Sequence, residues 1–512
     1  MSRPNPRLSL LIALADAGGA GAPSMQALGV TLSTALQDRP GSGLELVVAV
    51  PEGVPHPSTP RGVTVVSAPR DAGHPVLACL RAALAAATGD AVGVLAAGDI
   101  VEPGVLPALA DLLGVRPEID VLYTDEQWPG EGASGIATKP GWSPEYLRGT
   151  DYLGRLCLVR RDLLEAAGGF DERSSGAEEW DAHLRVTETV PTIVHVPVVA
   201  VSRPAAPLVP DESALATVRR HLDRLGSVAT VENAGLPGTV RVWREVIDQP
   251  LVSIVIPTVG TSRTVDGESG PLVSRCVRSL LDRTTYESWE VVLVTSEATP
   301  PEVVAEVRSA LGDRLVVAPI AGSFSFSDSI NEGARWAHGD LLLLLNDDTE
   351  AIEPRWLERM VSVIQDPSIG AVGAKLLFGD GRIQHLGVAH NDVWEPSHPF
   401  IFEQDGPGHG GMGVLDLDFP AVTGACLLTR ASTFRAVGGL CQELPLNYND
   451  VDFCFKVRST GLRVVGTPFA RLTHHESASR VATVTEDERA FLRRHWTAQA
   501  YDDPFVLLRE VR

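Results

Sequence analysis

The chain has 512 residues, enough for about two to four domains. Its formal net charge of −22 argues against a surface that binds nucleic acid or a broad anionic membrane. The six cysteines show no CxxC spacing and lie in apolar stretches, which is typical of small buried side chains in a reducing compartment and not of disulfides or zinc ligands.

A short apolar run, Leu8 to Ala15, follows Arg3 and Arg7 and is typical of a first strand. It is shorter than the about 20 apolar residues that a membrane-spanning helix needs, and it does not have the pattern of a secretory leader. We therefore expect a cytoplasmic protein without a transmembrane segment. Peripheral association with the inner membrane face stays open.

The first half of the chain is repeated in the second half, in the same order. Both halves alternate short β-rich runs with helical patterns, which predicts an α/β fold with a mostly parallel sheet in each. We place the boundary near Pro250, with domains at 1–248 and 249–512, and interpret the proline-rich stretch 203–210 as a loop. The corresponding stretches are Ala87–Asp90 with Ala337–Asp340, Asp99 with Asp348, Arg160–Gly169 with Arg430–Gly439, and Glu179–Asp181 with Asp450–Asp452.

The second half carries the most informative strand. Its predicted strands are 251–256, 290–294 and 341–345, and its predicted helices are 271–283, 327–338 and 354–365. The third strand is five consecutive leucines, which suits a strand buried on both faces, and Asn346, Asp347 and Asp348 follow it directly. Acids at the carboxyl end of a buried strand lie where open α/β sheets bind ligands, and they suit Mg²⁺ or Mn²⁺. A plain solvated turn would have the same composition.

Two further polar motifs follow in the second half, Asn449-Asp450-Val451-Asp452-Phe453-Cys454 and His474-His475-Glu476-Ser477. Together with the strand-end acids, they resemble family-2 glycosyltransferases, which are inverting, nucleotide-sugar-dependent enzymes of the GT-A fold. The likeness extends to bacterial polysaccharide enzymes with two such domains in tandem, including rhamnosyltransferases. The other matching stretches are Ser253–Thr258, Asn331–Asp340, Lys375–Gly387 and Thr423–Cys426.

The resemblance implies roles for the acids and the histidine. Asp348, Asp347 and His474 would hold Mn²⁺ or Mg²⁺, and Asp450 would act as the general base of a single, inverting displacement. His474 could equally be a packed or surface histidine. Asp452 is expected to brace the following helix, since Asp is favoured near helix N-termini.

The resemblance also implies a donor site and an acceptor site. Asn331 could instead be a plain helix-surface amide, and the segment from Trp394 to Gly413 is either a mobile acceptor lid or a solvated insertion. The donor-binding set is Pro257, Thr258, Thr295, Asn331, Asn346 and Asp347. The set that positions the donor sugar or the acceptor is Gln384, His385, Thr423, Gly424 and Asn449.

The first half keeps the pattern of the repeat but loses much of this chemistry. Ala96-Ala97-Gly98-Asp99 leaves a single acid after the strand, Glu179 stands at the base position, and Ser202-Arg203 replaces the histidine. We expect a degenerate GT-A domain that is structural or binds acceptor, with a second active site as the alternative.

The resemblance predicts an inverting, metal-dependent transferase that moves a sugar to a glycan or lipid-linked acceptor in bacterial cell-surface polysaccharide synthesis. The donor would be dTDP-rhamnose or a UDP-sugar. Two other classes remain: a non-catalytic sugar- or nucleotide-binding protein with decayed sites, and a nucleotidyl-sugar pyrophosphorylase. The sequence has no glycine-rich phosphate loop of the kind that would favour the last.

Overall fold

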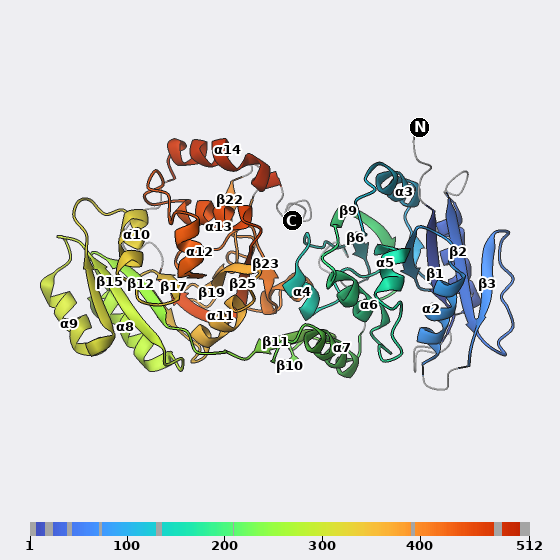
Figure 1. The fold of residues 1–512 in the computed structure, drawn as a ribbon, viewed down its shortest axis with the longest axis horizontal. Helices are drawn as coiled ribbons and strands as arrows, with labels where there is room; N and C mark the ends of the chain where they lie inside the picture. Colours follow the sequence, from blue (N-terminus) through green and yellow to red (C-terminus); the bar gives the residue numbers. More distant parts are fainter. Residues whose placement is uncertain are drawn as a thin grey trace. The chain divides into compact units, whose positions relative to one another are not determined.

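The computed structural model describes residues 7–15, 24–37, 43–70, 74–129, 136–207, 209–390, 395–475 and 484–501. The chain divides into two compact units, with the boundary between Val242 and Trp243, a few residues before the predicted position. Figure 1 draws the first unit from blue to green and the second from green to red. Among the described residues, no helix has the length and apolarity needed to cross a bilayer.

The first unit is built on a mixed sheet with strand order β3-β2-β1-β4-β8-β6-β9-β5. Its strands are β1 (Leu8–Ala13), β2 (Leu44–Pro51), β3 (Val63–Ala68), β4 (Ala91–Leu95), β5 (Ile100–Val101), β6 (Val121–Gln127), β7 (Ile136–Ala137), β8 (Leu158–Arg160) and β9 (Ile193–Ser202). Its helices are α1 (Met25–Leu36), α2 (Pro75–Ala86), α3 (Val105–Val115), α4 (Pro144–Gly149), α5 (Arg161–Ala166), α6 (Glu178–Thr187) and α7 (Asp211–Arg224). A separate pair, β10 (Ala229–Asn233) and β11 (Val240–Arg244), follows.

The second unit repeats this strand order as β16-β15-β12-β17-β24-β19-β25-β18. The strands of this sheet are β12 (Val252–Thr258), β15 (Trp289–Thr295), β16 (Leu315–Pro319), β17 (Leu341–Leu345), β18 (Thr349–Ala351), β19 (Ile369–Leu377), β24 (Cys426–Arg430) and β25 (Arg463–His474), joined at its margins by β20 (Ile383–His385) and β23 (Leu417–Asp418). The small pairs are β13 (Ser262–Val265) with β14 (Glu268–Pro271), and β21 (Ala389–His390) with β22 (Pro396–Ser397).

The helices of the second unit cover its sheet (Figure 1). They are α8 (Leu272–Arg283), α9 (Pro301–Leu311), α10 (Phe326–Trp336), α11 (Trp356–Ile364), α12 (Ala431–Ala436), α13 (Asn449–Ser459) and α14 (Glu486–Tyr501), with the 3₁₀ turns η1 (Gly312–Arg314) and η2 (His409–Val414). The predicted strands and helices of this half are confirmed, and so is the α/β class with largely parallel sheets.

The five leucines of β17 show why this strand lies at the centre of its sheet. Leu341, Leu343 and Leu345 belong to a core formed with α8, α9 and α11. Leu342 and Leu344 belong to a second core, formed with α10, α12 and α13. Because successive side chains of a strand point to opposite faces, a strand covered on both sides needs an apolar residue at every position.

The two sheets also share one polar brace at their amino edge. In the second unit, Ser253 Oγ donates to Glu290 Oε1 at 2.6 Å and accepts from the backbone N–H of Gly339 at 2.8 Å. In the first unit, Ser9 Oγ donates to Glu45 Oε2 at 2.6 Å and accepts from Gly89 N–H at 2.8 Å. A Cβ at Gly339 would lie 2.4 Å from a backbone oxygen, so the brace needs glycine there.

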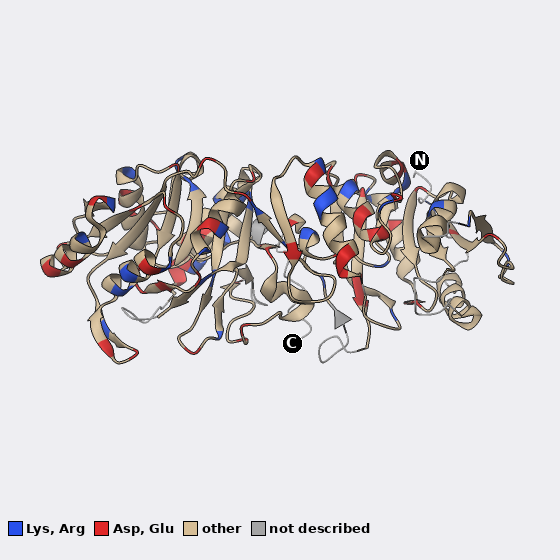
Figure 2. Ribbon diagram, turned by 90° about the horizontal axis from the view of Figure 1, so that it is seen from below, with Lys and Arg blue, Asp and Glu red and all other residues tan. Residues whose placement is uncertain are grey.

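Charged side chains of both signs are interspersed over the ribbon (Figure 2).

Candidate active site at the carboxyl edge of the second sheet

The acids predicted from the leucine run lie at the carboxyl edge of three neighbouring parallel strands. Thr258 ends β12 and pairs with Thr295 at the end of β15, one position beyond Pro257. Thr258 Oγ1 donates a hydrogen bond of 2.6 Å to Asp347 Oδ2, in the turn after β17. The structure therefore brings together most of the residues proposed for the donor, as strand ends in open α/β sheets do.

The two acids have an excess of buried negative charge. Burial raises the pKa of Asp347 to about 7 against the hydrogen bond from Thr258, and the carboxylate of Asp348 contributes to the rise. Burial also acts to raise the pKa of Asp348, but His474, by the hydrogen bond and charge of its protonated form, lowers it overall. A positive charge at this edge would relieve both carboxylates.

His474 ends β25 and faces the acids. Its Nε2 lies 3.1 Å from Asp348 Oδ1, and its Nδ1 lies 2.6 Å from Gln384 Oε1. Because Gln384 Oε1 is an acceptor, Nδ1 carries the proton, and Nε2 of the neutral ring is an acceptor that lies 3.2 Å from the amide nitrogen of Asn346 and beside Asp348 Oδ1. Asp348 Oδ1 is buried without an aligned hydrogen-bond donor. Two acceptors facing each other in this way fit a cation between or beside them.

The donor set is that of a hard divalent ion. Carboxylate oxygens suit Mg²⁺ and Mn²⁺, and a neutral imidazole is a common metal ligand. Among the described residues, no group of three His, Cys, Asp or Glu side chains forms a finished metal site. Such ions commonly take their remaining ligands from substrate phosphates and water.

Asp450 lies in the first turn of α13 and is held by two backbone donors. Its Oδ2 accepts from the N–H of Gly424 at 2.8 Å, and its Oδ1 accepts from the N–H of Val451 at 2.8 Å. The side chain is half-buried, so it reaches solvent or a ligand while its orientation is fixed. Tyr448, the N-cap residue before it, has a φ of 58°, a conformation that is uncommon outside glycine and that turns the chain into the helix.

The turn from Thr423 to Ala425 connects Asp450 to the acids. Gly424 donates to Asp450, while the carbonyl of Ala425 accepts from Asn346 N–H at 3.0 Å. Thr423 N–H donates to His385 Nε2 at 3.3 Å. A Cβ at Gly424 would lie 3.3 Å from Phe326 and 3.5 Å from Asp450, so any larger residue at this position would crowd these two side chains.

Three of the candidate residues have partners within the fold. Asn331 donates to the carbonyl of Leu440 and accepts from its N–H, both at 2.9 Å, so its amide fixes a turn away from the acids. Asn449 is buried and donates to the carbonyl of Leu444 at 3.2 Å. Asp452 pairs with Lys456 and accepts from Trp496 Nε1 at 2.8 Å, which agrees with a bracing role.

The segment before Gly413 is fastened to the sheet. Trp394 lies outside the described residues, whereas residues 395–475 are described. The buried Lys375 of β19 donates to Asp405 and, at 2.9 Å, to the carbonyl of Gly413. These contacts favour a fixed wall over a mobile lid. The Lys375–Asp405 ion pair could not be predicted from the sequence, because only the fold brings these two residues together.

The carboxyl edge of the first unit has no equivalent acids. Strand register pairs Ile100 with Ser202 there, and Glu350 with Thr473 in the second unit. Asp99 therefore corresponds to Thr349 and not to Asp348, so the predicted alignment of Asp99 with Asp348 is wrong by one residue. Asp99 accepts from Ala96 N–H at 2.7 Å, as a turn residue does.

Arginines occupy the corresponding place in the first unit. Arg160 and Arg430 occupy equivalent positions in the two sheets, and counting back from them aligns Arg155 with Ala425. Arg155 forms ion pairs with Glu179 and, at 3.3 Å, with Asp99. Directly after β9, Arg203 stands at the position of His474 and pairs with Glu126 at 2.9 Å. The carboxylates of this edge thus already have cationic partners within the protein.

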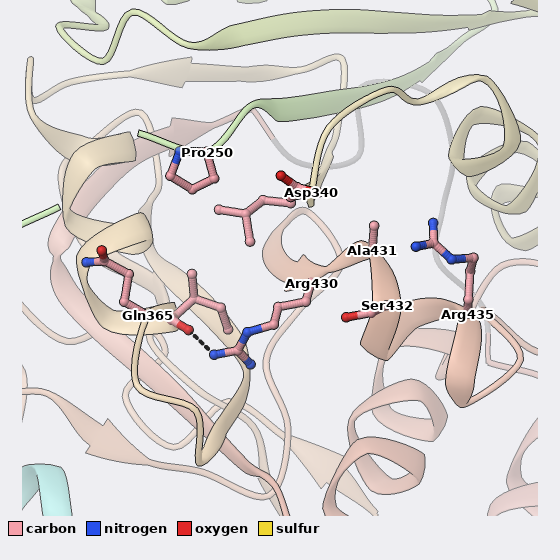
Figure 3. Close-up of a pocket in the computed structure, with 9 residues that line it drawn as sticks. Pro250, Asp340, Gln365, Arg430, Ala431, Ser432 and Arg435 are labelled. Carbon is pink, nitrogen blue, oxygen red and sulfur yellow. Dashed lines mark hydrogen bonds between the residues drawn. The ribbon is translucent and has the colours of Figure 1, made fainter. Parts of the chain in front are cut away.

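A pocket lies at the opposite edge of the second sheet. It is lined by Pro250, Asp340, Arg430 and Arg435, among others (Figure 3). The guanidinium of Arg430 donates there to two backbone carbonyls, that of Ile364 (dashed line in Figure 3) and that of Ile369 at 2.6 Å. Asp340 precedes β17 whereas the acids follow it, and this strand of 5 residues is about 16 Å long at about 3.3 Å per residue. The pocket is separate from the candidate site.

Comparisons with known proteins agree with the chemistry of this site. The family described as "Glycosyltransferase like family 2" matches residues 250–501. The O-antigen biosynthesis protein RfbC of Myxococcus xanthus is 35% identical over 414 residues, which cover 78% of this chain and 32% of that protein. The uncharacterized protein y4gI of Sinorhizobium fredii (strain NBRC 101917 / NGR234) is 32% identical over 451 residues, covering 82% of this chain and 48% of that protein. The chain thus spans half or less of each relative.

Solved structures with a related arrangement are more distant. The mannosyltransferase PcManGT from Pyrobaculum calidifontis, in complex with GDP-Man and Mn²⁺, is 17% identical, with a TM-score of 0.33 over 52% of this chain and 70% of that one. GalNAc-T7 with UDP, GalNAc and Mn²⁺ is 15% identical, with a TM-score of 0.38 over 49% of this chain and 50% of that one. At TM-scores this low, neither structure informs the site. The family match over the second unit identifies it: residues 250–501 of this chain belong to the family-2 glycosyltransferases.

Proposed function

We propose that the second unit transfers a sugar, with inversion, from a nucleotide diphosphate donor to a glycan or lipid-linked acceptor. The observation that carries the proposal is the turn from Thr423 to Ala425, which joins a half-buried carboxylate, Asp450, to the acidic strand end. A base and a diphosphate site held in one frame are what a direct displacement requires. The name of the relative RfbC supports a role in bacterial cell-surface polysaccharide synthesis.

Each side of the site has a distinct task. Asp348 and His474, with Asp347 beside them, would hold Mn²⁺ or Mg²⁺, which supplies Lewis-acid stabilisation of the leaving diphosphate. Asp450 accepts the proton of the acceptor hydroxyl as its oxygen bonds to the anomeric carbon. The bond from that carbon to the diphosphate oxygen breaks, and its electron pair leaves with the nucleoside diphosphate. One displacement from the opposite face inverts the anomeric centre.

The donor is proposed to be dTDP-rhamnose or a UDP-sugar. Thr258 and Thr295 bring hydroxyl groups, but no carboxylate, to the ends of their strands, and this pattern does not discriminate between the nucleotides. The first unit is proposed to be a GT-A-like module that is structural or binds acceptor, and a bound glycan there would raise the effective concentration of acceptor.

The test is release of nucleoside diphosphate with Mn²⁺ or Mg²⁺ across a panel of nucleotide sugars. Metal-dependent release from one donor, lost in Asp348→Ala and retained within about twofold in Asp99→Ala, would support transfer and name the donor. Pyrophosphate as the product would indicate a pyrophosphorylase instead. If no donor were turned over in the presence of a glycan acceptor pool and calorimetry detected only metal-free binding, the non-catalytic reading would replace this one.

A further inference from the structure

Two adjacent side chains of the short strand β20 point to opposite sides and reach the two halves of the site. Gln384 and His385 are 5% and 2% exposed, so neither presents a free surface to a sugar. Each instead contacts a different functional group: Gln384 contacts His474, and His385 contacts the turn that holds Asp450. Alternation along a strand explains how neighbours reach both sides.

On the metal side, Gln384 holds the ring of His474 through two hydrogen bonds. Its Oε1 accepts from Nδ1 of His474 at 2.6 Å, and its Nε2 donates to the backbone carbonyl of the same residue at 3.3 Å. The first bond fixes the proton on Nδ1 and so leaves Nε2 as an acceptor, 3.1 Å from Asp348 Oδ1 and 3.2 Å from Asn346 Nδ2. A hydrogen bond of this kind to the second nitrogen commonly orients a metal-binding histidine.

On the base side, His385 acts through the backbone. Its Nε2 accepts from Thr423 N–H, so its Nδ1 carries the proton and donates to Nδ1 of His398 at 2.9 Å. Burial holds the pKa of His385 well below its ordinary value, so the ring is neutral and keeps both roles. The next residue, Gly424, donates directly to Asp450. One bond at Thr423 thus sets the position of the N–H that orients the base.

We propose that Gln384 and His385 are positioning residues with separable effects, Gln384 fixing the metal-facing tautomer of His474 and His385 fixing the orientation of Asp450. This inference rests on the proposed function of the same site. It replaces the expectation that the two side chains contact the donor sugar or the acceptor.

The metal arm is tested by titrating Mn²⁺ into the full chain, a measurement that needs no turnover. Gln384→Leu keeps similar volume but removes the acceptor, and we expect the Kd for Mn²⁺ to rise about ten- to a hundredfold. Gln384→Glu keeps an acceptor oxygen and should stay within about fivefold of wild type. At saturating Mn²⁺, Gln384→Leu should recover most of the wild-type kcat.

The base arm is tested by kcat against donor and metal affinity. His385→Leu should lower kcat about tenfold or more while the Kd values for Mn²⁺ and donor stay within about twofold. His385→Gln, which can still accept from Thr423 N–H, should restore most of kcat. His390→Leu is the matched control, since His390 is equally buried and its ring stacks on Phe455; it should retain kcat within about threefold.

The outcomes separate the inference from the function beneath it. Wild type without donor turnover would overturn the proposed function, and the inference with it. An active wild type in which both Leu variants lose metal affinity and kcat alike, or in which His390→Leu loses as much as His385→Leu, would overturn the inference alone. Raised KM for donor or acceptor with unchanged kcat in either variant would restore direct sugar contact.

Discussion

The carboxyl edges of the two sheets solve the same electrostatic problem in different ways. In the second unit, Asp348 is buried and Asp347 half-buried, and their partners are the hydroxyl of Thr258 for Asp347 and the ring of His474 for Asp348. In the first unit, Arg155 and Arg203 stand at the positions of Ala425 and His474 and pair with the carboxylates present. The comparison teaches that carboxylates at this edge of the sheet can be balanced by arginine side chains from within the fold.

The first prediction tests the comparison at the base position. Asp450→Asn keeps the size of the side chain and one acceptor oxygen but cannot take a proton, so we expect kcat to fall about 10²- to 10⁴-fold with Mn²⁺ and donor affinity nearly unchanged. Glu179→Gln, at the corresponding position of the first unit, should leave kcat within about twofold. Steady-state kinetics and calorimetry measure both, and a comparable loss in Glu179→Gln would make the first unit catalytic.

The second prediction transplants the arginine. Ala425→Arg places a guanidinium where the first unit has Arg155, and we expect it to neutralise the strand-end acids and to lower both Mn²⁺ affinity and kcat about a hundredfold. Mn²⁺ titration and turnover are the measurements. Ala425→Met controls for bulk at this buried position. If the Met variant lost metal affinity as severely, crowding and not charge would explain the effect.

The third prediction concerns pH and is confined to the first unit. Burial acts to lower the pKa of His183, but the Asp151 carboxylate, 2.9 Å away, raises it overall to about 10. This pair therefore stabilises the folded unit fully below about pH 6.5, and its contribution, on the order of 5 kcal/mol, is lost as pH rises toward 10.

The second unit has Ala421 and Cys454 at the corresponding positions, both fully buried. The double variant Asp151→Ala/His183→Ala has no titratable side chain at either position, so it should abolish most of the stability loss between pH 7 and 9.5, measured as the shift of the urea unfolding midpoint with pH. An unchanged pH dependence would mean that other groups cause it.

The local sequence predicted the part of the site that depends on one strand. Leu341–Leu345 followed by two acids predicts a buried strand and a ligand-facing turn, because burial and alternation are local properties. His474, which was proposed as a ligand from the family resemblance, likewise lies at a strand end beside the acids.

The rest depended on contacts distant in sequence. Gln384 was expected at the sugar, but it lies 90 positions from its partner His474, and only the sheet brings them together. Asp99 was aligned by its chemistry with Asp348, whereas the strand register, set by long-range pairing, aligns it with Thr349. The contact of Asn331 was equally out of reach of local sequence, since its amide donates to the carbonyl of Leu440, 109 positions away.

The Ser–Glu–Gly brace at the amino edge of each sheet has a consequence for how such a protein can change. Ser253 with Glu290, and Ser9 with Glu45, hold equivalent strands by equivalent bonds although the opposite edges have diverged. The residues that secure the architecture are thus located away from those that carry chemistry. Mutations can accumulate at one end of the strands without weakening the other, and a copied domain is free to exchange its reactivity for a new role while it continues to fold.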